Sequence, residues 1–224
     1  MHKDHILCIG DTHFPFEHKD YLDFVLQIKD RVKCGTVVHI GDLVDNHSLS
    51  YHEHNPNGRS PLDEINEARQ KVKKWAKAIP KMLICRGNHD CLIERKARTN
   101  GMPEIAFKPF REIWDLPLLW KDEWEHNLYG VKFIHGTGYS GDNAHLKASY
   151  DNRQSVVIGH THSFGGVGYM ANNRDCVFGL NVGCGIDRHK YAFTYGKDFK
   201  KKPILGCGVI TDNGKFAQVF PMPL

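Results

Sequence analysis

Short apolar runs, separated by amphipathic segments, extend over most of the chain. Each run is about four to six residues long and ends in a polar cluster, which is typical of a buried strand followed by a loop. These runs predict strands over residues 6–9, 36–40, 82–85, 131–134, 155–158 and 176–181. Because such strands alternate with amphipathic segments, the pattern predicts an α/β fold.

Helical periodicity fills the longer gaps between the first strands. Apolar positions over residues 20–32 share one helical face and predict an amphipathic helix. A second helix is predicted over 61–79, with Ser60 as its N-cap and Pro61 at its first position. The pattern over 91–114 is less regular, and we expect this segment to be mostly helical.

The end of the chain has the pattern of a β-hairpin. Apolar segments at 205–210 and 216–220 flank the turn residues 212–214, which read Asp-Asn-Gly. The spacing favours parallel pairing among the early strands and antiparallel additions late in the chain. No repeat or linker interrupts the series, so we expect residues 1–224 to form a single domain.

The composition indicates a globular protein without a membrane span. Hydrophobic residues make up 41% of the chain and charged residues 25%, and no run approaches the roughly 20 apolar residues of a spanning helix. The seven cysteines are scattered without a C-x-x-C pair, which favours free thiols in a reducing compartment. The first residues lack the apolar core of a secretory signal, so we expect a cytoplasmic protein.

Histidine is the unusual component, with fifteen residues of this type in the chain. Histidine binds transition metals and transfers protons near neutral pH, so its positions are candidates for chemistry. The net charge of +4 is mild, but acidic residues held by metal would leave a more basic surface. This charge is compatible with an anionic substrate.

Polar clusters follow five of the predicted strands. In chain order they are Gly10-Asp11-Thr12-His13, Gly41-Asp42-Leu43-Val44-Asp45, Gly87-Asn88-His89-Asp90, His135-Gly136 and Gly159-His160-Thr161-His162. Each cluster alone is ordinary turn chemistry. If the strands share a sheet, however, all five clusters converge on the edge where such sheets bind ligands. Together they supply carboxylates, an amide and imidazoles, which suit Mn, Fe or Zn.

Dispersed ligands of this kind fit phosphoester hydrolysis. A phosphoester resists attack by water because the nucleophile meets an already anionic centre. Two cations about 3.5 to 4 Å apart lower the pKa of a shared water, neutralise phosphate charge and stabilise the leaving oxygen. Two cations need a bridging anion and several further ligands, which a single motif cannot supply.

The motifs D-x-H, GDxxD, GNHD, a later His and GHTH, in this order over residues 11–162, resemble the calcineurin-like metallophosphoesterase family. The resemblance implies an α/β/β/α fold, in which two central mixed β-sheets are flanked by helices. It also implies hydrolysis of a phosphoester by a hydroxide that bridges two divalent metal ions. Manganese is the expected metal, with Fe, Zn, Ni and Mg as alternatives.

The resemblance also assigns roles to residues of this chain. Asp11, His13 and His162 would hold one metal, Asn88, His135 and His160 the other, and Asp42 would bridge them. His89 would act as general acid or phosphate-stabilising donor, with Asp45 to orient it. His126 and His145 remain competitors for the place of His135, which the preceding predicted strand favours.

The substrate class is less defined than the reaction. Family members that act on phosphoproteins continue GDxxD with Arg-Gly, whereas Asn46 and His47 follow Asp45 here. A phosphodiester is therefore slightly favoured, and the partner is a small-molecule or nucleic-acid phosphoester rather than a membrane. The alternatives are a phosphomonoesterase or phosphoprotein phosphatase, and a noncatalytic metal-binding scaffold.

Three further segments are candidates for ligand contacts. Residues 136–141 match G-x-G-x-x-G after a strand, but the next strand ends in Gly159-His160 instead of an acid, which disfavours a dinucleotide site. The loop 46–60 and the segment 183–190 are candidate rims of the substrate site. The histidines and cationic residues of these two segments are His47, His52, His54, Arg59, Arg188, His189 and Lys190. Arg153, outside both segments, is a further candidate.

Overall fold

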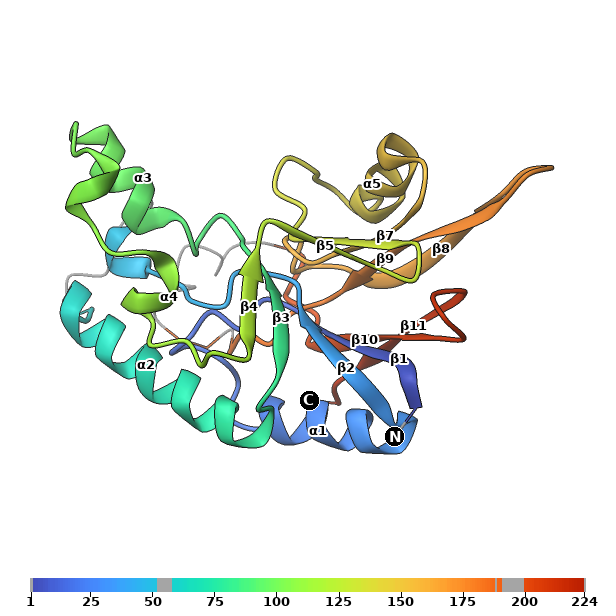
Figure 1. The fold of residues 1–224 in the computed structure, drawn as a ribbon, viewed down its shortest axis with the longest axis horizontal. Helices are drawn as coiled ribbons and strands as arrows, with labels where there is room; N and C mark the ends of the chain where they lie inside the picture. Colours follow the sequence, from blue (N-terminus) through green and yellow to red (C-terminus); the bar gives the residue numbers. More distant parts are fainter. Residues whose placement is uncertain (1, 52–57, 188, 191–199, 224) are drawn as a thin grey trace.

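Two β-sheets stack face to face, and helices cover the outer face of each (Figure 1). The computed structural model describes residues 2–51, 58–187, 189–190 and 200–223. Four layers result, in the order helix, sheet, sheet, helix. This is the predicted α/β/β/α arrangement.

The first sheet has six strands in the order β11-β10-β1-β2-β3-β4. Their bounds are β1 His2–Ile9, β2 Cys34–His39, β3 Met82–Cys85, β4 Trp120–Glu123, β10 Gly206–Thr211 and β11 Phe216–Pro221. Strands β1 to β4 pair in parallel, whereas β10 pairs antiparallel with β1 and β11 pairs antiparallel with β10. The predicted parallel core and C-terminal hairpin are therefore confirmed.

The second sheet has five strands in the order β5-β6-β7-β9-β8. Their bounds are β5 Glu125–Leu128, β6 Val131–Ile134, β7 Ser155–Ile158, β8 Gly165–Ala171 and β9 Cys176–Val182. The three central strands are parallel, and β5 and β8 pair antiparallel at the two edges. Both sheets are thus mixed.

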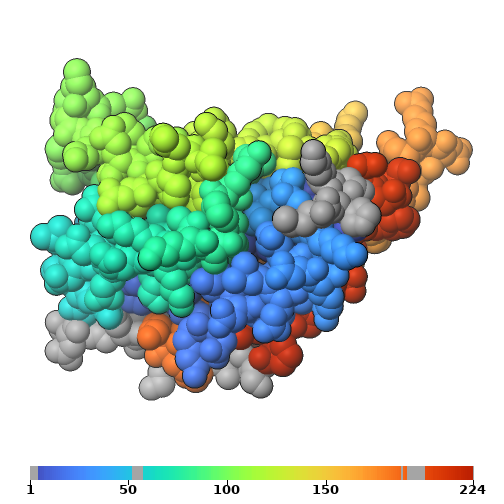
Figure 2. Space-filling view, turned by 60° about the horizontal axis from the view of Figure 1, so that its bottom comes forward, coloured from blue at the N-terminus to red at the C-terminus, as the bar shows by residue number. Residues whose placement is uncertain are grey.

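Helices α1 and α2 lie beneath the first sheet, side by side on the face shown in Figure 2, and α5 covers the second sheet. Their bounds are α1 Tyr21–Val32, α2 Pro61–Ala78 and α5 Ala144–Asn152. The smaller helices are η1 His47–Leu49, α3 Leu92–Thr99, η2 Glu104–Ala106 and α4 Phe110–Ile113. Ser60 caps α2 by accepting from the Asp63 N–H, as its sequence predicts. No helix of the described chain has the length and apolarity to cross a membrane.

The alternation of side chains along β1 explains the layering. Leu7 faces the helical layer, where it joins a buried cluster with Trp75 of α2. Its neighbour Cys8 points to the opposite side and packs with Leu180 of β9, between the sheets. A strand that is buried on both faces needs two partners, and each fully buried large apolar side chain stabilises the fold by about 1.5–3 kcal/mol.

The structure corrects the prediction in three places. The strands β4, β5 and β8 were not predicted, because they are edge strands with half-exposed or glycine-rich sequences that lack a clear apolar run. The segment 91–114 is helical only at α3, η2 and α4. The polar clusters also do not share one sheet, since β1 to β3 and β6 to β7 belong to different sheets.

Candidate metal centre

The predicted ligands meet where the carboxyl ends of the two sheets adjoin. Asp11 and His13 follow β1, and Asp42 follows β2. Asn88 and His89 come after β3 in the same sheet. The second sheet contributes His135 directly after β6 and the pair His160 and His162 after β7. Convergence therefore arises from stacking two sheets.

One ligand cluster combines Asp11, His13, Asp42 and His162, whose ligand atoms all lie within 4.8 Å of one another. Nε2 of His162 is 2.9 Å from Oδ2 of Asp11. Nε2 of His13 is 3.7 Å from Oδ2 of Asp42. Asp11, His13 and Asp42 are buried, whereas the side chain of His162 is 21% exposed. Among its four side chains, only that of His162 reaches solvent.

A second cluster shares Asp42 and adds His135 and His160. Nε2 of His135 is 3.1 Å from Oδ2 of Asp42 and 3.2 Å from Nδ1 of His160. The same nitrogen is 3.0 Å from Oδ1 of Asn88. The resemblance implies a bridging position for Asp42, and Asp42 belongs to both clusters.

The donor set fits two cations. Nδ1 of His135 lies 3.0 Å from the carbonyl of Ile40, which can only accept, so Nδ1 carries the proton. The lone pair of a neutral His135 ring then points from Nε2 at a carboxylate oxygen of Asp42. A proton or a cation between these atoms removes the conflict. Oδ1 of Asp11 is also buried without a hydrogen-bond partner among the described residues.

The electrostatics show the same demand for positive charge. Burial acts to lower the pKa of His135, but Asp42 and Asp11 outweigh it and raise the pKa to about 10. Burial acts to raise the pKa of Asp42, yet His135 and His89 hold that pKa well below its ordinary value. Buried carboxylates of this kind are ordinarily paired or bound to metal.

The motif glycines are explained by close contacts with ligands. A Cβ on Gly41 would lie 2.7 Å from Nδ1 of His135, and one on Gly159 would lie 2.2 Å from Oδ1 of Asp11. A Cβ on Gly87 would lie 2.1 Å from Oδ1 of Asp42. Two of these three contacts join one sheet to the other. The glycines therefore allow the ligands to approach each other.

Three ligands have a left-handed backbone. The φ angles are 48° for His13, 47° for Asp42 and 63° for His160. This region is sparsely populated by residues with a Cβ, and it concentrates at functional sites. The turn that follows each strand thus directs a ligand back toward the centre.

His89 lies at the edge of the centre, with its side chain 17% exposed. Its Nδ1 donates to the backbone carbonyl of Asp45 at 2.7 Å and lies 3.5 Å from the Asp45 carboxylate. That carboxylate makes a shorter contact, 2.5 Å, with Nδ1 of His13. Asp45 therefore fixes the ring of His13 with its side chain and the ring of His89 mainly with its backbone.

Several supporting residues were not identified from the sequence. Oγ1 of Thr12 donates to the Leu43 carbonyl and lies 3.0 Å from Nε2 of the buried His39. Nδ2 of Asn181 donates to Oγ1 of Thr161. The middle residues of D-T-H and H-T-H are thus both held by a polar group of a neighbouring strand. Such pairings follow from strand order, which the motifs do not contain.

Asp90 ties two of the ligand loops together. Its carboxylate accepts from the Val44 N–H at 3.1 Å and from the Gly87 N–H at 2.8 Å. Burial raises the pKa of Asp90 to about 7, with a further contribution from Asp42. The last residue of the GNHD motif, which had no predicted role, therefore holds this loop against the GDxxD loop.

The competing histidines lie outside both clusters. Nε2 of His126 is 3.0 Å from the Ile84 carbonyl, and His145 is buried in α5, where its ring stacks on Phe164. Only His135 among these three contacts Asp42. The choice of His135 agrees with its placement.

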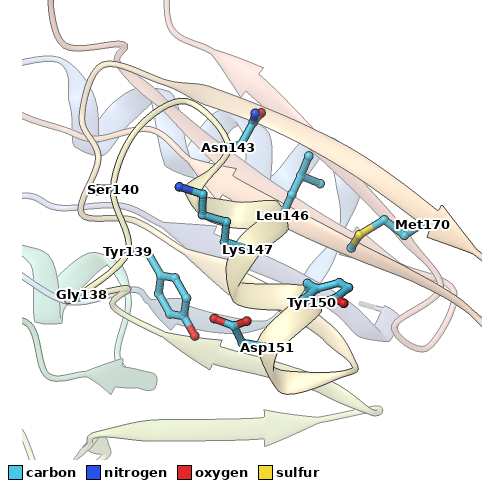
Figure 3. Close-up of a pocket in the computed structure, with 9 residues that line it drawn as sticks. All are labelled: Gly138, Tyr139, Ser140, Asn143, Leu146, Lys147, Tyr150, Asp151 and Met170. Carbon is cyan, nitrogen blue, oxygen red and sulfur yellow. The ribbon is translucent and has the colours of Figure 1, made fainter.

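The glycine-rich segment 136–141 has the predicted context of a strand before it and a helix after it. It passes over α5 and borders a hollow of about 610 Å³ (Figure 3). Lys147 and Asp151 project from α5 toward the segment, beside Tyr139. The parallel strand β7 ends at Ile158, and His160, two residues later, belongs to the second ligand cluster. The described residues at the end of β7 therefore lack the acidic residue that a dinucleotide-binding site needs, as expected from the sequence.

The candidate rims are placed only in part. His47 is buried in η1, and the backbone N–H groups of His47 and Ser48 donate to the buried carboxylate of Glu64 on α2. Arg59 pairs with Glu67, while His189 and Lys190 are exposed. Arg153 is exposed as the C-cap of α5. His52, His54 and Arg188 lie outside the described residues.

Fold and donor set together define a protein with adjoining His/Asp clusters that could hold divalent metal ions. The sequence profile of the calcineurin-like phosphoesterase family matches residues 5–177, so the chain belongs to this family. No curated protein matches the sequence.

Solved structures with a similar arrangement include Vacuolar Protein Sorting 29 from Cryptosporidium parvum, at TM-score 0.47 and 14% identity, covering 98% of this chain and 96% of that one. A Vps29 mutant from Entamoeba histolytica gives a TM-score of 0.45 at 11% identity, with coverages of 98% and 99%. YfcE, a phosphoesterase from E. coli, gives 0.41 at 16% identity, with coverages of 93% and 88%.

Proposed function

We propose that the protein is a metal-dependent phosphodiesterase that uses two divalent cations, with manganese as the preferred metal. The observation that carries the proposal is the pair of ligand clusters sharing Asp42. The assigned ligands are Asp11, His13 and His162 for one cation, Asn88, His135 and His160 for the other, and Asp42 for both. When bound, the cations activate water and neutralise phosphate charge.

The protein's own groups position the reactants. The Asp45 carboxylate accepts a hydrogen bond from Nδ1 of His13, and the Ile40 carbonyl accepts one from Nδ1 of His135. Nε2 of each ring is therefore directed toward the centre. Orientation of this kind keeps each ring in the tautomer that binds metal. Carboxylates and imidazoles are thereby fixed before substrate arrives.

His89 is the proposed general acid. Its Nδ1 proton is held by the Asp45 carbonyl, so Nε2 is the nitrogen that can donate to the leaving oxygen. Burial acts to lower the pKa of His89, but Asp42 and Asp45 raise it above the ordinary value. This shift favours the protonated form of the His89 ring relative to a free imidazole.

A diester is preferred because the described site lacks a cation for an additional phosphate charge. Among the ion pairs and hydrogen bonds of the described residues, no lysine or arginine contacts Asp11, Asp42, Asp45, His89, His135, His160 or His162. Asn46 and His47 do not replace the missing Arg-Gly, since Asn46 donates to the His89 carbonyl and His47 is buried. A dianionic monoester would be neutralised less completely than a monoanionic diester.

The test compares bis-p-nitrophenyl phosphate with p-nitrophenyl phosphate in the presence of Mn²⁺, Ni²⁺, Mg²⁺ or Zn²⁺. We expect faster hydrolysis of the diester, and a fall in kcat of about 10²- to 10⁴-fold in His89→Ala with the metal content unchanged. A monoesterase would reverse the substrate order. A noncatalytic scaffold would hydrolyse neither compound with any of the four metals.

A further inference from the structure

An exposed tyrosine packs against α3, the helix that follows the His89 loop of the metal centre. Tyr51 is 54% exposed, and its hydroxyl lies 3.3 Å from Oγ1 of Thr99. Nζ of Lys96 is 4.0 Å from the centroid of the tyrosine ring, and Cζ of Arg95 is 5.4 Å from it. The ring is thus held in place by the helix while much of its surface remains free for a ligand.

The two cations beside this ring have no acidic partner among the described residues. The neighbouring acids are engaged elsewhere, since Glu94 pairs with Arg86 at 3.7 Å and Glu104 pairs with Arg98 at 2.6 Å. Within the described part of the chain, no carboxylate forms an ion pair with Arg95 or Lys96. An exposed aromatic ring with excess positive charge favours an anionic ligand that also carries flat rings.

The chain between the centre and Tyr51 runs along α3. Asn46 directly follows Asp45 and donates to the His89 carbonyl, and η1 then lies beside α3 (Figure 1). Helix α3 itself begins soon after His89. The Leu92 N–H at the start of α3 donates to the His89 carbonyl, and a rise of about 1.5 Å per residue places Lys96 about 6 Å from Leu92 along the helix. The tyrosine is therefore a short distance from the proposed general acid.

We propose that Tyr51, Arg95 and Lys96 form a nucleobase-stacking site for single-stranded nucleic acid whose scissile phosphodiester lies at the metal centre. Stacking on an aromatic ring tolerates any base, and the cations offset phosphate charge. Stacked nucleotides advance by about 3.4 Å each, so the rise of about 6 Å along α3 from Leu92 to Lys96 corresponds to roughly two nucleotides. The inference rests on the proposed phosphodiesterase function and specifies its substrate class.

The binding test uses fluorescein-labelled hexanucleotides of thymidine and uridine, measured by fluorescence anisotropy. The metal-loaded His89→Ala protein slows turnover and serves as the parent. We expect Tyr51→Ala to weaken binding about tenfold, whereas Tyr51→Phe keeps the ring and retains affinity. The matched control is Tyr150→Ala, which removes another exposed tyrosine on α5 and leaves affinity unchanged. The two oligonucleotides show whether DNA and RNA are distinguished.

Charge is tested separately from stacking. Lys96→Ala and Arg95→Ala each reduce the slope of log affinity against log salt by about 0.7, the value for one phosphate contact on a single strand. In turnover with His89 present, Tyr51→Ala lowers the ratio of kcat/KM for the hexanucleotide to that for bis-p-nitrophenyl phosphate about tenfold.

Two results would overturn the stacking site. One is equal hexanucleotide affinity in Tyr51→Ala and its parent. The other is that Tyr51→Ala weakens binding of a duplex as much as binding of a single strand. Paired bases cannot stack on the ring, so the stacking site predicts an effect on single strands alone. Failure of the proposed function looks different, since bis-p-nitrophenyl phosphate would then remain intact in the protein with Tyr51 and His89 in place.

Discussion

The two sheets contribute different chemistry to the centre. The first sheet supplies both carboxylates of the ligand clusters, Asp11 and Asp42, and the supporting Asp45, each at most 2% exposed. The second sheet supplies only imidazoles, and the side chain of its His162 is 21% exposed. The first sheet thus creates buried negative charge that needs cations, while the second completes their coordination and borders solvent.

Removing first-sheet charge should have the largest effect. Asp42→Asn eliminates the carboxylate common to both clusters, so we expect loss of both metals. We also expect kcat/KM to fall by more than the 10- to 100-fold that is typical when a residue hydrogen-bonded to a metal ligand is replaced. Elemental analysis of dialysed protein and bis-p-nitrophenyl phosphate kinetics measure these effects. Two bound metals in Asp42→Asn would contradict a bridging role.

The same variant separates charge from folding. Without metal, Asp42→Asn should unfold at a lower temperature than the wild type near neutral pH, because the buried His135 loses the carboxylate that balances its charge. Excess Mn²⁺ should stabilise only the wild type, by about 2.7 kcal/mol at one hundred times Kd. Thermal denaturation with and without metal provides the measurement.

Removing a second-sheet imidazole should have a smaller effect. His162→Ala loses a ligand of one cluster only, so we expect one metal per chain to remain and a partial loss of activity. The control is His126→Ala, whose ring bonds to the Ile84 carbonyl away from both clusters and should leave stoichiometry unchanged. Loss of both metals in His162→Ala would show that the sheets do not divide the task in this way.

The smallest expected effect concerns the contact between the sheets. In Gly159→Ala the new Cβ would lie 2.2 Å from Oδ1 of Asp11, so we expect metal affinity to fall about tenfold to one hundredfold. Gly138→Ala is the matched control, because its Cβ meets no atom within 4 Å, although φ is +97°. Isothermal titration with Mn²⁺ compares them. Equal affinities in the two variants would show that the approach of Gly159 to Asp11 does not control metal binding.

The ligand set could be predicted because each ligand lies in a short motif directly after an apolar run. Asp42 and His135 are 3.1 Å apart although no local pattern relates them, and only the family resemblance joined them beforehand. The assumption that one sheet gathers every motif was wrong. The convergence depends on packing between sheets, which involves residues such as Cys8 and Leu180 far apart in the chain.

The supporting contacts could not be predicted from motifs. His39 and Asn181 act because β2 and β9 lie beside the strands that carry Thr12 and Thr161, and strand order is a tertiary property. The edge strand β4 also escaped prediction, since a half-exposed strand has no continuous apolar run. The motif residues could therefore be predicted from the sequence, whereas the residues that position them could not.

The most direct test of the account is a titration of metal-free protein with Mn²⁺ while hydrolysis of bis-p-nitrophenyl phosphate is followed. The shared Asp42 predicts that the rate reaches its plateau at two equivalents of Mn²⁺ per chain and returns to background with excess chelator. A plateau at one equivalent, or no metal-dependent hydrolysis, would contradict a two-metal phosphodiesterase.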